Sequence, residues 1–475
     1  MRSRAGIQVR CRRDFPLQIF SPVIMQPLGL FGAILLAALA GCAQLSGEKE
    51  RRHTPAEIAA YRPADFIAPI ASSEGERMAV AEREARIRDA LQAPASPANG
   101  DEDSGAPGAL WAIAFLNRDR AEGLGILQNA LIAIDTKPVD FQRAVLSAAY
   151  TMYARESVPA IWPLLDRINT PREFAIAAYT MLKAQDSAET RAMLRAKLVA
   201  KFPDWINEGR LIALEHALTT DAATERRTRG PLIDLLAAPF RPGLPVIFSF
   251  QRPDRTHPGL AMVRGADGRF IRNADGGYFA IAHLALALSN LPGTITNGNT
   301  PQGLFTIVGA GTATNPWIGP TPYLHSKIPK EATLAEYEHA NIEGEWSVAR
   351  YESFLPLSWR RYFPFKEAWH AGLAGRDDML LHGSTINPEY YRNNSYYPGT
   401  PSAGCLVAME YWSKSDGRLM HSDQLTLAKA FTAGGLDRGY LVVVELDDRA
   451  QAVNLADVIG DVIAAEATVR TRSRD

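Results

Sequence analysis

The stretch LPVIFSF, residues 244–250, marks the point where the character of the chain changes. Its apolar residues lack the three- and four-residue spacing of a helix, and β-branched and aromatic residues dominate it, which indicates a buried strand. LAMVRGADGRFI, 260–271, predicts two short strands joined by an Asp-Gly turn. Further runs of strand character lie at 304–309, 379–383 and 440–446. Helices are expected here only at 278–290 and 423–435, so this part of the chain is expected to be mostly β.

Upstream of that point, residues 109–240 show the opposite pattern. Ala, Leu, Ile and Met recur at three- and four-residue spacing, which predicts one amphipathic helix after another. The pentapeptide AAYTM occurs at 148–152 and again at 177–181, which suggests stacked helix pairs of a solenoid. The expected fold class is therefore α+β and multidomain, with an N-terminal α-helical, solenoid-like domain followed by a mostly β domain at 241–450.

Length and charge set the broad class of the protein. A chain of 475 residues predicts two domains or more. Its 51 Lys and Arg residues nearly balance 52 Asp and Glu residues, for a net charge of -1. Because nucleic-acid binding depends on a basic surface, this balance gives no reason to expect a nucleic-acid partner.

The first 41 residues have the features of an export signal. Five arginines within residues 1–13 are followed by an apolar run that ends in small residues, and that run is too short for a comfortable membrane span. Leu39-Ala40-Gly41-Cys42 resembles a bacterial lipobox, in which the leader is cut before the cysteine and the cysteine is lipidated. We therefore expect a lipoprotein signal peptide at 1–41, lipidation at Cys42, and a periplasmic protein anchored to the outer membrane.

Two further segments are assigned from composition. Residues 42–108 are expected to be the lipid-anchored cysteine and a flexible linker, since 93–108 is rich in Pro, Gly, Ser and Asp. A charged helix is expected just before that stretch. Residues 451–475 are expected to form a C-terminal helix or tail.

Cys405 would then be the one thiol of the mature protein, because Cys11 leaves with the leader and Cys42 becomes the anchor. In an oxidising compartment such a thiol is either buried and structural or chemically useful. It follows Gly404, which permits a tight turn with unshielded backbone N–H groups. His382 lies 23 residues upstream, at the end of an apolar strand, and a histidine within hydrogen-bond reach activates a thiol. On these residues alone, His382 is equally a surface histidine.

A further motif favours the catalytic interpretation. Thr300-Pro301-Gln302-Gly303-Leu304-Phe305-Thr306-Ile307, His382-Gly383 and Ser402-Ala403-Gly404-Cys405 occur in this order. Together they resemble the L,D-transpeptidase (YkuD-type) catalytic domain, a family of peptidoglycan enzymes. The resemblance covers roughly residues 244–448.

The resemblance implies roles for individual residues. Cys405 would be the nucleophile, His382 would take and return its proton, and Ser402 would shape the turn. The N–H groups of Gly404 and Cys405 would hold the oxyanion. Substrate-binding candidates are Gly383, Tyr397, Arg392 and Arg361. No metal or other cofactor is implied, and the sequence has no Cys/His cluster with zinc spacing.

This sequence departs from the family pattern at two positions. Ala403 stands where the family often has a second histidine, so the group that orients His382 must be a backbone carbonyl or another residue. Val407 stands where the family commonly has an arginine, for which Arg360, Arg361 or Arg392 are candidate replacements. A roomier or differently charged acceptor side would favour hydrolysis over transfer to an amine, and the sequence leaves both outcomes open.

The expected function is therefore that of a peptidoglycan L,D-transpeptidase with stem peptides as substrate. The alternatives are an L,D-carboxypeptidase or endopeptidase with the same site, and a non-catalytic envelope scaffold. The lipid anchor implies contact with a membrane, and the helical domain is a candidate surface for a protein partner.

Overall fold

The computed structural model describes residues 51–92, 105–132 and 134–472. The expected signal peptide at 1–41, Cys42, and residues 93–104 of the expected linker lie outside the described residues. Residues 105–108, also expected to be linker, form the start of a helix. Within the described ranges, no helix combines the length and the apolar character needed to cross a bilayer.

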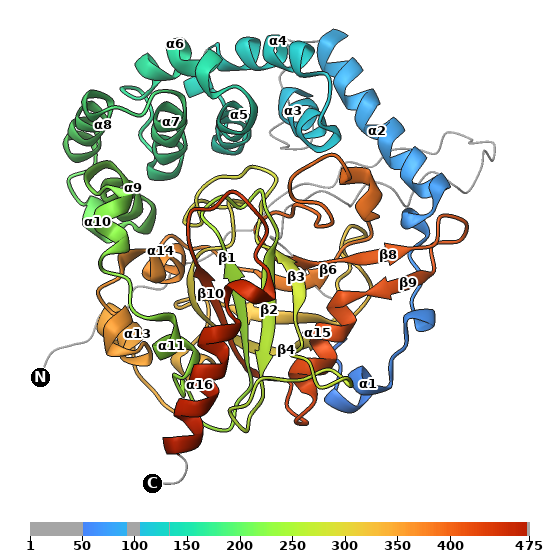
Figure 1. Cartoon of the computed structure of the whole chain (residues 1–475). Helices are drawn as coiled ribbons and strands as arrows, with labels where there is room; N and C mark the ends of the chain where they lie inside the picture. The colour runs from blue at the N-terminus through green and yellow to red at the C-terminus, as the bar shows by residue number, and fades with distance from the viewer. Residues whose placement is uncertain (1–50, 93–104, 133, 473–475) are drawn as a thin grey trace, which may run out of the picture. The chain divides into compact units, whose positions relative to one another are not determined.

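The predicted helical segment is present. Helices α2 to α10 form a curved double row (Figure 1). On one side of this row, neighbouring helices pack in succession: α3 (Gly105–Leu116), α5 (Val139–Met152), α7 (Pro171–Ala184) and α9 (Gly209–Thr219). The remaining helices are α2 (Ser73–Gln92), α4 (Arg120–Leu131), α6 (Ala154–Leu164), α8 (Ala188–Lys201) and α10 (Ala222–Arg226). The two AAYTM copies lie in α5 and α7, which contact each other.

Residues 51–92 do not behave as the expected flexible linker. Helix α1 (Pro55–Ala60) packs against the barrel helix α15 (Asp423–Thr432), and its Ile58 is fully buried. In α2, the guanidinium of Arg83 is buried over three aromatic rings, those of Trp111, Phe115 and Trp317. The charged helix expected just before residue 93 is present as α2. Its packing was not expected, because its few buried positions are scattered among charged residues.

The second part of the chain is built on a closed barrel with the strand order β1-β10-β4-β5-β6-β7-β3-β2. The strands are β1 (Val246–Gln251), β2 (Gly259–Arg264), β3 (Ile281–Leu284), β4 (Gly303–Gly311), β5 (Tyr323–Lys327), β6 (Leu380–Gly383), β7 (Leu406–Ala408) and β10 (Gly439–Glu445). The pairs β1–β10 and β6–β7 are parallel, and the other pairs are antiparallel. Outside the barrel, β8 (Glu410–Trp412) pairs with β9 (Leu419–Ser422).

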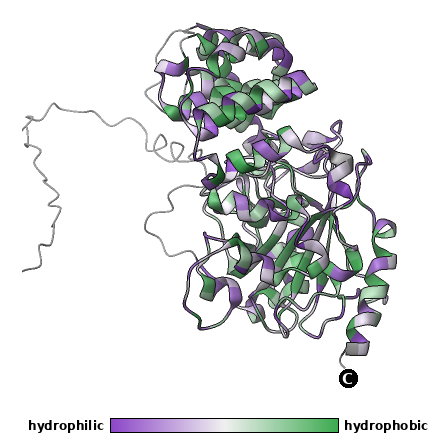
Figure 2. Cartoon of the chain, turned by 90° about the vertical axis from the view of Figure 1, so that its left-hand side faces the viewer, coloured by the Kyte–Doolittle hydropathy of each residue, from purple (hydrophilic) through white to green (hydrophobic). Residues whose placement is uncertain are grey.

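Two cores lie on the two sides of the barrel wall. Alternate residues of all eight strands form the inner core together with Leu427, Ala428 and Phe431 of α15. The outer core joins β1, β2, β4 and β10 to the helices α11 (Leu232–Leu236), α13 (Val348–Phe354) and α16 (Ile459–Arg472). Hydrophobic residues gather on the strands, whereas the helices carry both hydrophobic and hydrophilic residues (Figure 2).

The prediction of a mostly β L,D-transpeptidase-like domain is wrong. The residues after 241 form a closed mixed barrel with many helices, including α12 (Leu334–Glu338) and α14 (Glu367–Leu373), which the sequence did not indicate. The run at 278–290, expected to be a helix, contains β3 instead. It is apolar at nearly every position, and such a run does not distinguish a strand from a helix. The predicted helix at 423–435 is present as α15, and the predicted C-terminal helix as α16.

Candidate active site

The parallel pairing of β6 and β7 brings His382 and Cys405 together. Leu381 pairs with Leu406 and His382 with Val407, so Cys405 stands one residue before β7, beside Leu380. The thiol Sγ accepts a hydrogen bond from the Leu380 N–H at 3.4 Å and donates to the Asp378 carbonyl at 3.7 Å. Because side chains two residues apart on a strand share a face, Cys405 and Val407 lie on the face that His382 occupies on the neighbouring strand.

The His382 ring is held in one tautomer by the backbone. Its Nδ1 lies 2.7 Å from the carbonyl oxygen of Gly383. A carbonyl only accepts, so Nδ1 carries the proton and Nε2 keeps its lone pair. Burial lowers the pKa of His382 to about 4, against the opposing effect of this hydrogen bond. The imidazole is therefore neutral at neutral pH, and the carbonyl of Gly383 is the orienting group that the sequence left unidentified.

The turn before Cys405 is closed by Ser402. Its Oγ accepts a hydrogen bond from the Gly404 N–H at 3.0 Å and donates to the Cys405 carbonyl at 2.8 Å. Ser402 thus shapes the turn as expected. The Gly404 N–H, expected to bind an oxyanion, is instead engaged by Ser402.

Arg376 forms the floor under this turn, and the sequence analysis missed it. Its guanidinium is 4% exposed and donates to the carbonyls of Gly293, Gly298 and Asn299. A Cβ at Gly404, where φ is +122°, would lie 2.1 Å from Arg376 Nη2. The one available signal was its position four residues before β6, and its carbonyl partners lie about eighty residues upstream. Arg376 places a positive charge beside the turn, and Val407, at the family's arginine position, is buried.

The predicted substrate-binding residues lie in different surroundings. Tyr397 and Arg392 are exposed on the loop between β6 and β7, and Arg392 faces Glu389 at 3.9 Å. Gly383 is needed for packing, since a Cβ there would lie 2.0 Å from the Glu410 carboxyl carbon. Arg361 is exposed and follows Trp359, which is anchored in the outer core rather than near Cys405.

A group of side chains of the types that bind metal ions includes Asp378, whose carbonyl contacts the thiol. Ligand atoms of His325, Glu331 and Asp378 lie within 4.8 Å of one another. Burial raises the pKa of Glu331 to about 7, while its carboxylate accepts hydrogen bonds from the N–H groups of Ile328 and Asp378. The three residues come from separate segments, so no motif of fixed spacing in the sequence predicted this group.

Comparisons of this chain with protein-family models, with curated proteins and with solved structures found no match. The functional assignment therefore depends on the residues and geometry described above.

Proposed function

We propose that this protein is a cysteine acyltransferase that acts on peptidoglycan stem peptides, with the reaction of an L,D-transpeptidase. The observation that carries the proposal is the placement of His382 on β6 and of Cys405 immediately before the adjacent parallel strand β7. The histidine there is neutral and has its Nδ1 proton fixed on the Gly383 carbonyl. The motif resemblance supplies the substrate class.

In the first half-reaction, Cys405 Sγ forms a bond to the carbonyl carbon between an L-centre and D-alanine. The thiol proton passes to His382 Nε2 and then to the leaving amine as the carbon–nitrogen bond breaks. In the second, an acceptor amine attacks the thioester, a new amide forms, and a proton returns to Sγ. The resemblance assigns the oxyanion to the N–H groups of Gly404 and Cys405, and Ser402 engages the Gly404 N–H in this structure.

The test uses the full chain carrying Cys11→Ser and Cys42→Ser, incubated with a disaccharide-tetrapeptide and analysed by mass spectrometry. We expect a cross-linked dimer that has lost one D-alanine. We expect no such product from the protein that also carries Cys405→Ala. If the only product is a monomer that has lost D-alanine, the protein is a hydrolase and not a transferase. An unchanged substrate with a folded protein would contradict both enzymatic assignments.

A further inference from the structure

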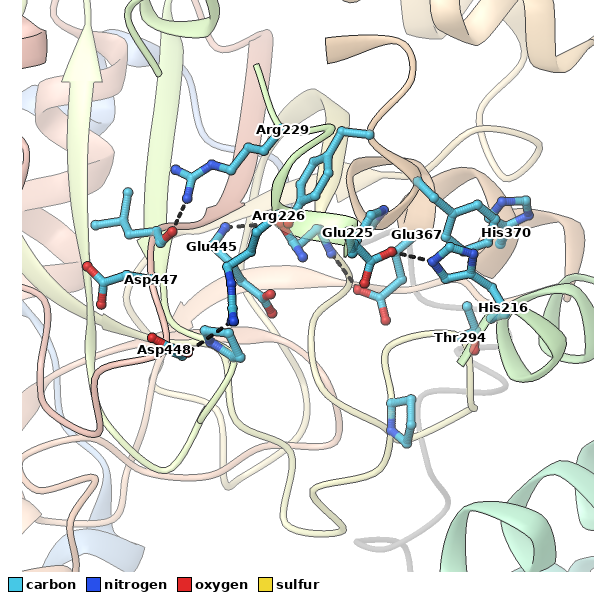
Figure 3. Close-up of a pocket in the computed structure, with 18 of the residues that line it drawn as sticks. His216, Glu225, Arg226, Arg229, Thr294, Glu367, His370, Glu445, Asp447 and Asp448 are labelled. Atoms are coloured by element: carbon cyan, nitrogen blue, oxygen red, sulfur yellow. Dashed lines mark hydrogen bonds and ion pairs between the residues drawn. The ribbon is translucent and has the colours of Figure 1, made fainter. Parts of the chain in front are cut away.

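A cavity of about 300 Å³ lies between the helical row and the barrel, apart from the Cys405 turn. It is lined by side chains from α7, α9, α10 and α14, from the loop that contains Thr294, and from the chain after β10 (Figure 3). Apolar walls come from rings such as Tyr362 and Phe363. Phe363 is stacked between His216, at 3.7 Å between ring centroids, and His370, at 4.9 Å.

Several polar groups of this cavity have no partner within the described part of the chain. Thr294 is fully buried, and its Oγ1 makes no hydrogen bond there. His370 is 7% exposed, and neither of its ring nitrogens is hydrogen-bonded. Since buried polar groups nearly always have partners, a ligand is the natural complement for groups that line an open cavity.

The charges of the cavity favour a cation. Its carboxylates outnumber its two arginines, and both arginines are engaged: Arg226 with Asp448 at 2.9 Å, and Arg229 with the Leu446 carbonyl. Glu367 is different, because within the described part of the chain its oxygens accept hydrogen bonds only from the backbone N–H groups of Gly293 and Gln302. Among the described residues, no side chain forms an ion pair with it.

Glu367 also connects the cavity to the nucleophile. Its two oxygens hold Gly293 and Gln302, at the two ends of one loop, at 2.9 and 2.8 Å. The carbonyl of Gly293 accepts from Arg376, whose guanidinium lies against Gly404. Near the other end, the Thr300 hydroxyl donates to the Gly404 carbonyl at 2.9 Å. One carboxylate therefore anchors both ends of the platform on which Cys405 sits.

We propose that this cavity binds a small organic cation, an amine with a compact apolar body. Its ammonium group lies against Glu367, and its binding changes the reactivity of the Cys405 thiol through the loop 293–302. The apolar body fits beside Tyr362 and Phe363, and Thr294 and His370 supply hydrogen-bonding groups. The proposal does not rest on acyl transfer, because thiol reactivity is measured without turnover.

The binding experiment uses the full chain with Cys11→Ser and Cys42→Ser, and benzylamine as the probe, followed by calorimetry. Benzyl alcohol and benzoate have the same ring without the positive charge. We expect saturable binding of benzylamine, at least tenfold weaker binding of the two controls, and at least tenfold weaker benzylamine binding after Glu367→Gln. Equal binding of benzyl alcohol, no saturable binding, or indifference to Glu367→Gln would overturn the site.

A second variant covers the case in which Glu367→Gln fails to fold. Thr294→Val keeps the shape of the side chain and removes the unpartnered hydroxyl, and we expect it to weaken benzylamine binding about threefold or more. Unchanged binding would exclude Thr294 from the site and overturn that part of the proposal.

The coupling is measured as the rate of iodoacetamide alkylation at Cys405 with and without saturating benzylamine. We expect the rate to change at least threefold, and to stay constant in Glu367→Gln. Binding without a change in rate would overturn the coupling. Loss of peptidoglycan turnover has no bearing on either result, so failure of the proposed function remains distinguishable.

Discussion

The loop 293–302 separates two regions that treat their polar groups in opposite ways. On the Cys405 side, Ser402 and Thr300 satisfy the backbone of the turn, and Arg376 satisfies carbonyl groups of the loop itself. On the other side, Thr294 and His370 line the cavity, and their side chains have no hydrogen-bond partner among the residues that the structure describes. A nucleophile needs a rigid support, whereas a binding site keeps groups available for a ligand. The same loop therefore supports the Cys405 turn on one side and lines the proposed binding cavity on the other.

The titratable groups of the two regions also have pKa values that are shifted in opposite directions. Burial lowers the pKa of His382 to about 4, so the fold keeps the uncharged base. Burial raises the pKa of Glu367 to about 7, so the uncharged acid and the carboxylate are both populated at neutral pH. The same physical cause, desolvation of the charged form, therefore gives the two sides pH dependences of opposite sign.

The largest effect is expected from Arg376→Met, which removes the floor of the turn. Its three carbonyl partners would lose their donor, and each buried acceptor left unpaired costs about 1–3 kcal/mol. We expect the free energy of unfolding in urea to fall by about 3–5 kcal/mol. Arg360→Met is the matched control, since Arg360 also donates to backbone carbonyls but is less buried. Equal losses in both variants would refute a special role for Arg376.

The next effect tests how tightly the turn rests on that floor. Gly404→Ala introduces a Cβ at a positive φ and in collision with Arg376 and the Gly298 carbonyl. We expect a loss of about 2–4 kcal/mol in unfolding free energy, from backbone strain and steric overlap together. Gly375→Ala has a positive φ with nothing within 4 Å, and it isolates the strain alone. If the two variants lose the same stability, the close contact at Gly404 contributes nothing.

Much of this molecule follows from local sequence, and the remainder depends on distant partners. The strands at 244–250 and 440–446 and the helix at 423–435 were predicted because composition and periodicity agree there. The run at 278–290 was misassigned because uniform apolarity has no period. Closure of the barrel pairs β1 with β10, about two hundred residues apart, and no local pattern encodes that pairing.

The candidate site divides in the same way. His382, Ser402 and Cys405 were found because they lie in short motifs around a turn and a strand end. Arg376 and Glu367 were missed because their partners belong to the loop 293–302, which only the fold brings near them. The expected linker over 42–108 failed for residues 51–92, because Arg83 is buried against aromatic rings that come from other segments.

A smaller effect is expected from His382→Gln, through the pH dependence of stability. The unfolded histidine binds a proton below its ordinary pKa of about 6.5, whereas the folded one stays neutral down to about 4. Stability should therefore fall as pH falls from about 6.5 to about 4, and the variant should flatten this limb by about 1–3 kcal/mol. Urea unfolding at several pH values measures it. His283 and His370 are also buried and their pKa values are lowered, so part of the loss of stability at low pH will remain in the variant. An unchanged limb would show that His382 is not held neutral.

The smallest effect is expected from Glu367→Gln on the cavity side. Its contribution to the pH dependence of stability has the opposite sign to that of His382. The folded pKa of Glu367 lies above that of an unfolded glutamate, so its contribution is full below about pH 4.5 and is lost as pH rises through about 7. The charges that act on it are Glu445, which favours protonation, and Arg255 and Arg376, which oppose it. Glu367→Gln mimics the protonated acid and should remove about 1–2 kcal/mol of the decline between pH 4.5 and 7. Gln302 lines the same cavity without titrating, so Gln302→Glu would add a decline rather than remove one. If Glu367→Gln instead reduced the loss of stability at low pH that is assigned to His382, the two regions would titrate together. The loop 293–302 would then not separate them.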